Sequence, residues 1–116
     1  MRILVIEPLQ KPVIREINGS LKSMQQVVGG LIQAVYPFPE PVAIVANDEG
    51  KILGLLPNRG LFDENGELYD ILCGTFFICG IEGDSFVSLT DEQVKRFEQL
   101  FAVPELFVKE DLGDES

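Results

Sequence analysis

The most continuous apolar segment of the chain is Ile71–Ile81, ILCGTFFICGI. If it is extended, successive side chains point to opposite faces, and both alternating sets are mostly apolar. A strand that is apolar on both sides is typical of the interior of a sheet that is covered on both faces. The pattern therefore predicts one central strand over Ile71–Ile81, bent or bulged near Gly74.

Shorter runs rich in β-branched and aromatic residues predict the other strands. These runs are Arg2–Glu7, Val13–Ile17, Leu31–Phe38, Val42–Ala46, Lys51–Leu56 and Phe86–Leu89. The first two flank a proline-bounded turn and predict an antiparallel pair. The turn Asn47–Gly50 predicts a hairpin between Val42–Ala46 and Lys51–Leu56. Pro57–Gly60 is expected to be a turn or irregular segment, and Asp63–Gly66 a second hairpin-like turn.

Two segments carry the 3.6-residue period and the end signals of helices. Ser20 is a good N-cap for a helix over Ser20–Val28, which Gly29 and Gly30 end. A glycine pair could also belong to a phosphate-binding loop, but such loops precede a helix. Thr90 and Gln93 form a capping box at the start of a helix over Asp91–Phe101. The pattern predicts an α+β fold in which a mostly antiparallel sheet of about five to seven strands carries these two helices.

Length and composition limit the possible classes of protein. At 116 residues with 46% hydrophobic residues, residues 1–108 are expected to form one domain and residues 109–116 an acidic, frayed tail. No apolar run reaches the length of a membrane span or a signal segment, so we expect a soluble cytoplasmic protein without membrane association. Cys73 and Cys79, placed in one strand, would lie roughly 20 Å apart and unbridged, which suits a reducing compartment.

The sequence offers no pattern for a metal, a cofactor or a catalytic nucleophile. It has no histidine and no CxxC motif, so we expect no metal site and no cofactor. The turns Asn47–Gly50 and Asp63–Gly66 lack the ligand spacing of a calcium loop. Cys73 has no activating base and lies in an apolar run that raises a thiol pKa. The sequence therefore favours a non-catalytic role.

The net charge of −10 is unevenly distributed. Residues 1–39 carry +2, residues 40–92 carry −9, residues 93–104 carry +1 and residues 105–116 carry −4. An acidic field repels nucleic acid and attracts basic surfaces, so we expect a protein partner with a basic surface and no direct nucleic-acid binding. The alternative is that the charge only keeps the protein soluble.

Pro57-Asn58-Arg59 is the first candidate for chemistry. Arg59 is one of two bases among residues 40–92, and beside Asn58 it could hold an anionic ligand. Asp70 and Thr75 would join this ligand site if the loop folds back. Alternatively, Arg59 only balances the nearby acids of residues 63–70.

Tyr36 and Phe38 lie at a proline-rich corner, PFPEP. If exposed there, the two rings would form an interaction site, whereas buried rings would fill the core. This corner, or an open sheet edge, could also join copies of the chain into a homo-oligomer.

Four segments stand out along the chain: LKSMQQVVGGLIQAVYPF, NDEGKILGLLPNRGL, YDILCGTFFICG and SLTDEQVKRF. Together they resemble a small family that is described only as a domain of unknown function, and the resemblance covers roughly residues 1–102. The resemblance implies a bacterial protein of Firmicutes, their phages or mobile elements, and no mechanism.

Three hypotheses about function remain open. We favour a non-catalytic interaction or regulatory accessory domain of a phage or mobile element, with mimicry of DNA charge as a narrower version. The alternatives are a binder of anionic small molecules, or a small enzyme, at Asn58, Arg59 and Asp70, and a structural subunit of a homo-oligomer.

Overall fold

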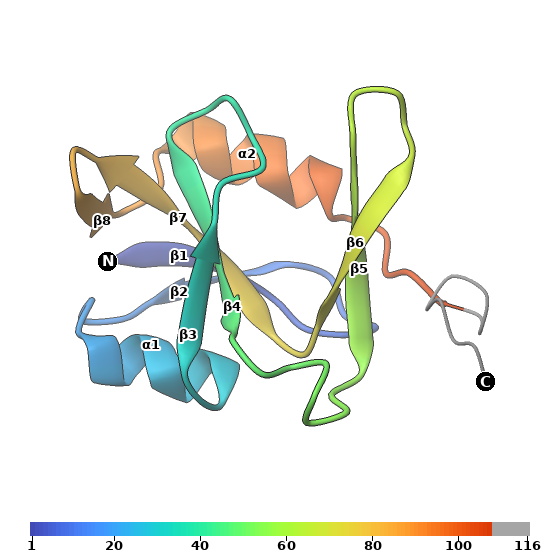
Figure 1. Cartoon of the computed structure of the whole chain (residues 1–116). Helices are drawn as coiled ribbons and strands as arrows, with labels where there is room; N and C mark the ends of the chain where they lie inside the picture. The colour runs from blue at the N-terminus through green and yellow to red at the C-terminus, as the bar shows by residue number, and fades with distance from the viewer. Residues whose placement is uncertain (108–116) are drawn as a thin grey trace.

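The computed structural model describes residues 1–107, which form eight strands in two antiparallel sheets and two helices (Figure 1). The strands are β1 Arg2–Ile6, β2 Val13–Glu16, β3 Ile32–Val35, β4 Val42–Asn47, β5 Pro57–Phe62, β6 Leu68–Cys73, β7 Phe76–Glu82 and β8 Ser85–Val87. The main sheet has the order β2-β1-β7-β4-β3, with β8 paired to β7, and β5 pairs only with β6. The α+β class is confirmed, with eight strands where five to seven were expected.

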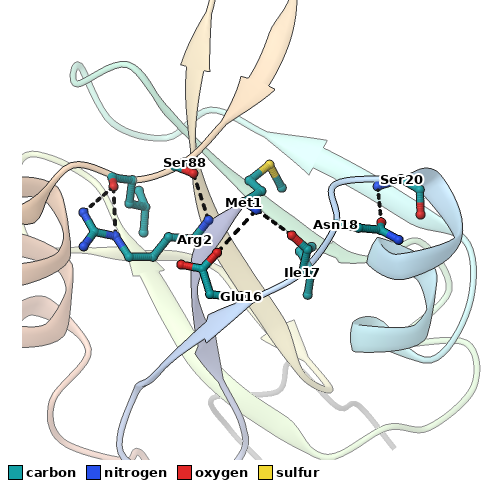
Figure 2. A network of polar contacts seen from close by, with 8 residues as sticks. Met1, Arg2, Glu16, Ile17, Asn18, Ser20 and Ser88 are labelled. Carbon is teal, nitrogen blue, oxygen red and sulfur yellow. Dashed lines mark hydrogen bonds and ion pairs between the residues drawn. The ribbon is translucent and has the colours of Figure 1, made fainter.

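The antiparallel pair predicted at the start of the chain is present as β1 and β2. Arg2 lies opposite Glu16, and the register continues to Val5 opposite Val13. Figure 2 shows how the start of β1 is held: the Met1 ammonium group donates to the Ile17 carbonyl, and the Arg2 backbone donates to the Ser88 hydroxyl. β1 is thereby joined to β2 on one side and to the segment after β8 on the other.

The centre of the main sheet is β7, which pairs with β1, β4 and β8. Phe76 and Ile78 point into one core cluster, with Phe97 of helix α2 (Asp91–Leu100). Phe77 and Cys79 point into a second cluster, with Met24 of helix α1 (Leu21–Val28). The prediction of a central strand covered on both faces is therefore confirmed for β7.

The prediction of one strand over Ile71–Ile81 is wrong. β6 ends at Cys73 in the two-stranded sheet, and β7 begins at Phe76 in the main sheet. Gly74 between them has φ +86°, and a Cβ atom there would lie 2.6 Å from Leu55 Cδ1. The chain changes sheet at Gly74 through a left-handed backbone conformation, which glycine adopts without strain. A side chain at this position would be strained and would also collide with Leu55.

The predicted strand Lys51–Leu56 is also wrong. Both edges of β4 are taken by β3 and β7, so no edge is left for a returning strand. The segment coils instead, with hydrogen bonds from Leu53 N–H to Glu49 O (2.8 Å) and from Leu55 N–H to Gly50 O (3.0 Å). Pro57–Gly60, expected to be a turn, is the start of β5, and proline is tolerated at a first strand position. The turn Asp63–Gly66 joins β5 to β6 as predicted.

Both helices begin, and α1 also ends, as their cap signals predict. Ser20 accepts a hydrogen bond from Ser23 N–H, and Gly29 closes α1 in the left-handed conformation at φ +80°. Thr90 and Gln93 form the capping box of α2. The helices lie on opposite faces of the main sheet (Figure 1).

The C-terminal tail and possible membrane spans were also subjects of prediction. The predicted acidic tail, residues 109–116, lies outside the described residues. Neither helix of the described chain is long and apolar enough to cross a membrane.

Candidate functional site

Asn58 occupies a fully buried position on β5, between the two sheets. Its Nδ2 group donates to the Ile6 carbonyl at the end of β1 (2.8 Å) and to the Gly74 carbonyl between β6 and β7 (2.9 Å). Its Oδ1 atom accepts from Arg59 Nη1 (2.8 Å). Asn58 therefore joins both sheets through main-chain groups.

Arg59 is 0% exposed, and its guanidinium group is completely engaged. Nε and Nη2 donate to the Phe101 carbonyl (3.4 and 3.0 Å), and Nη2 also donates to the Gln10 carbonyl (2.7 Å). Nη1 donates to the Asn58 carbonyl (3.3 Å) and to Asn58 Oδ1. These five bonds match the five N–H donors of arginine. Phe101 is the C-cap of α2, so the cation also lies at the end of the helix dipole that favours it.

The sequence suggested that Arg59 either binds an anionic ligand or balances the acids of residues 63–70, and the environment of Arg59 agrees with neither interpretation. Its acceptors are main-chain carbonyls and one amide, and none of the ion pairs among residues 1–107 involves it. Burial lowers the pKa of Arg59, while the Glu105 carboxylate acts in the opposite direction. The guanidinium group has no solvent-facing surface to offer an anion, so the Asn58–Arg59 pair is a structural element of the fold.

Asp70 and Thr75 are placed apart from this pair. Asp70 lies on β6 opposite Leu61, and its carboxylate pairs with Lys51 Nζ at 2.6 Å. Thr75 is half-buried immediately after Gly74. No hydrogen bond or ion pair of the described chain joins Asp70 or Thr75 to Arg59.

The Lys51–Asp70 ion pair lines a cleft of about 380 Å³ between residues 47–52 and 70–73. Asp48 and Glu49 also line this cleft, so its charged side chains are three acids and one base. The base is already paired with an acid. Such a cleft disfavours an anionic ligand, because the net charge of its walls is negative.

Tyr36 and Phe38 have different environments. Phe38 packs on the core, with its ring centroid 4.9 Å from that of Phe97 and 6.4 Å from that of Phe101. Tyr36 is 60% exposed. Of the two aromatic residues of this corner, Tyr36 is therefore the one that is available for contacts with another protein.

A second pair of exposed aromatic residues was not predicted. Phe62 at the end of β5 and Tyr69 on β6 are 54% and 55% exposed. They line one hollow of about 140 Å³ together with Phe38, Leu100 and Glu105. The only sequence signal for this pair is one aromatic residue on each side of the turn Asp63–Gly66, and it identifies a site only once the hairpin is known.

The turn between these aromatic residues is acidic and exposed. Asp63 and Glu64 lie in it and Glu67 directly follows it, and no ion pair of the described residues involves these three acids. Asp63 Oδ1 accepts from the backbone N–H groups of Asn65 and Glu67, both at 2.9 Å, which orders the turn. In Figure 1 this turn is the upper end of the β5–β6 hairpin, which extends beside the main sheet.

The two cysteines are free, and burial suppresses their acidity. Burial raises the pKa of Cys79 to about 12. Burial also raises the pKa of the half-buried Cys73, with Lys51 opposing and Asp70 adding to the effect. Neither thiol has the low pKa of a catalytic cysteine.

We expect iodoacetamide at about pH 8 to label Cys73 slowly and to leave Cys79 unlabelled in the native protein, because the thiolate is the reacting species. In denaturant both should be labelled at similar rates. Mass spectrometry of the labelled peptides measures this. Native labelling of Cys79 as fast as Cys73 would contradict the buried environment.

Within residues 1–107, no group of three or more Cys, Asp or Glu side chains lies close enough to hold a metal ion.

Comparison with models of known protein families gives a match that covers most of the chain. The sequence model of the family described as "Domain of unknown function (DUF3846)" matches residues 1–102. No curated protein and no solved structure matches the chain significantly.

Proposed function

The chain belongs to the DUF3846 family, whose description states no activity, and from this premise we propose that it is a non-catalytic protein-interaction module. We propose that it serves as a regulatory accessory protein of a bacterium, phage or mobile element, in the cytoplasm. Its partner presents a basic segment with apolar side chains, and the β5–β6 hairpin binds that segment.

The observation that carries this proposal is the aromatic hollow beside the acidic turn. Phe62 and Tyr69 expose about half of their surface and share the hollow with the end of α2. Aromatic residues are enriched among the side chains that dominate binding energy at protein interfaces. An apolar side chain of the partner would enter the hollow.

The charge of the hairpin favours a basic partner over an acidic one. Asp63, Glu64 and Glu67 surround the tip, and the chain as a whole carries −10. Such a field increases the rate of encounter with a basic segment and weakens as salt is added. The polar residues that suggested a ligand site do not compete with this proposal, because Asn58 and Arg59 are buried and bonded internally.

The test is a pull-down from a bacterial lysate over a series of salt concentrations. We expect the wild-type chain to retain a basic protein at low salt. The double variant Phe62→Ser/Tyr69→Ser should lose it, with affinity reduced about tenfold or more. The double variant Glu64→Lys/Glu67→Lys should release it at lower salt than the wild type does. Circular dichroism establishes that each variant is folded.

Ile52→Ser is the matched control. Ile52 is 85% exposed in the segment of turns after β4, outside the β5–β6 hairpin. Its replacement therefore removes exposed apolar surface that does not belong to the proposed binding site. Ile52→Ser should retain the partner as the wild type does. Retention of no protein at low salt, or equal retention by all of these variants, would contradict the proposal.

A further inference from the structure

The two edges of the main sheet differ in their chemistry. The edge strand β2 contains Arg15 and Glu16 and follows Lys11 and Pro12. The edge strand β3 lies in the segment 31–38, LIQAVYPF, which contains no charged residue. Charges and prolines are the usual protection of an edge strand against pairing with another strand. β3 lacks such protection until Pro37.

The register of β3 with β4 determines which backbone groups point outward. Asp48 N–H donates to the Leu31 carbonyl, and this pairing continues to Gln33 opposite Ala46 and Val35 opposite Ile44. In an antiparallel ladder, hydrogen-bonded positions alternate. The N–H and C=O groups of Ile32, Ala34 and Tyr36 therefore point away from β4. None of the loop and turn hydrogen bonds of residues 1–107 uses them.

We propose that two copies of this chain associate through β3, which pairs antiparallel with β3 of the second copy and joins the two main sheets into one. The two-fold axis passes between the two Ala34 residues. Ile32 then lies opposite Tyr36 of the second copy, and Gln33 lies opposite Val35. Figure 1 shows β3 along the front edge of the sheet, with β4 behind it.

The pattern of β3 is self-complementary in this register. The three outward positions pair only with one another, because 32 pairs with 36 and 34 pairs with 34. Small alanines meet at the axis, and an aromatic residue lies opposite a β-branched one on each side of it, a favourable cross-strand combination. Tyr36 precedes Pro37, which restricts it to an extended backbone suited to continuing the strand. No like charges are brought together.

The other edge strand, β2, cannot pair in the same way with β2 of a second copy. Ile17 N–H donates to the Met1 carbonyl, and Figure 2 shows the reciprocal bond, so Ile14 and Glu16 carry the outward groups. Pairing Ile14 with Glu16 of a second copy places Arg15 opposite Arg15. Shifting the register by two residues brings Pro12, which has no N–H, opposite Glu16. The sheet is therefore open to a second copy at β3 and protected at β2.

Analytical ultracentrifugation of the full chain over a range of concentrations tests this proposal. We expect a species of twice the 12.9 kDa chain mass to form as the concentration rises. Added salt should strengthen it, because each chain carries −10 and screening reduces their repulsion. This direction is the opposite of that expected for a basic partner on the hairpin. The two proposals can therefore fail independently.

Ala34→Pro is the decisive variant. It removes the central outward N–H, which the monomer does not use, and proline is tolerated at such edge positions. Loss of the two reciprocal bonds at the axis should raise the dissociation constant on the order of 30-fold. If Ala34→Pro does not fold, Gln33→Lys/Tyr36→Lys replaces it, because both side chains are exposed in the monomer. Ile14→Lys on β2 is the control and should dimerise as the wild type does.

A wild-type chain that stays monomeric at roughly millimolar concentration and high salt would overturn the proposal. Equal dimerisation of the wild type and the β3 variants would also overturn it. Loss of the dimer in Ile14→Lys alone would place the interface on β2 instead.

Discussion

Arg59→Met is expected to remove about 3–5 kcal/mol of the free energy of unfolding. Methionine keeps the apolar stem, but the buried oxygens of Phe101 and Asn58 and the partly buried carbonyl of Gln10 then lose the guanidinium donors. Each unpaired buried acceptor costs about 1–3 kcal/mol. Urea denaturation followed by far-ultraviolet circular dichroism measures the loss. Because a domain of this size is stable by only about 5–15 kcal/mol, the variant should be close to unfolding.

Arg15→Met is the matched control, because Arg15 is exposed on β2 and forms no ion pair within the described chain. Its effect should stay within about 0.5 kcal/mol. Arg59→Lys adds a test of geometry, since one ammonium group cannot replace the planar five-donor fork, and it should also be destabilised. A loss below about 1 kcal/mol in Arg59→Met would show that the guanidinium group does not hold β5 to the end of α2 and to the loop after β1.

Asn58→Ala should remove about 2–4 kcal/mol. The change removes the side-chain donor that the Ile6 and Gly74 carbonyls share and opens a small cavity between the two sheets. It also removes the acceptor of Arg59 Nη1, so the two residues should be coupled. A double-mutant cycle with Arg59→Met should give a coupling energy of about 1–2 kcal/mol, measured by the same urea denaturation.

Asn65→Ala provides the comparison for this second prediction. Asn65 is exposed in the turn of the β5–β6 hairpin, and removing its side chain should change stability by less than about 0.5 kcal/mol. Strictly additive effects of Asn58→Ala and Arg59→Met would mean that the two residues act independently, against the network described above.

These two predictions rest on the part of the fold that the local pattern describes least well. Asn58 and Arg59 are polar residues in an irregular-looking segment, which favours an exposed loop by composition. Their acceptors lie far away in the sequence: Arg59 binds a carbonyl 42 residues later and another 49 residues earlier. A local pattern carries no information about such partners, so burial of the pair could not be predicted.

The aromatic pair of the hairpin is unpredicted for a related reason. Phe62 and Tyr69 are ordinary strand residues by propensity. They form a site only because the two-stranded sheet leaves the main sheet and packs beside the end of α2, where Leu100 and Phe101 complete the hollow. By contrast, Phe38 was open to either reading, and its contact with Phe97 assigned it to the core.

The sequence by itself determined the features that depend on residues close to one another along the chain. Both helices follow from their caps, the turn Asp63–Gly66 from its Asx chemistry, and the burial of Phe76–Cys79 from its doubly apolar pattern. Only the tertiary structure decided that Ile71–Ile81 is divided between two sheets. Alternation of side chains is the same in β6 and in β7, whereas the partner of a strand is chosen by segments distant in the chain. Gly74 allowed the division, and the buried Asn58 of β5 binds the Ile6 carbonyl of β1, which joins the two sheets that result.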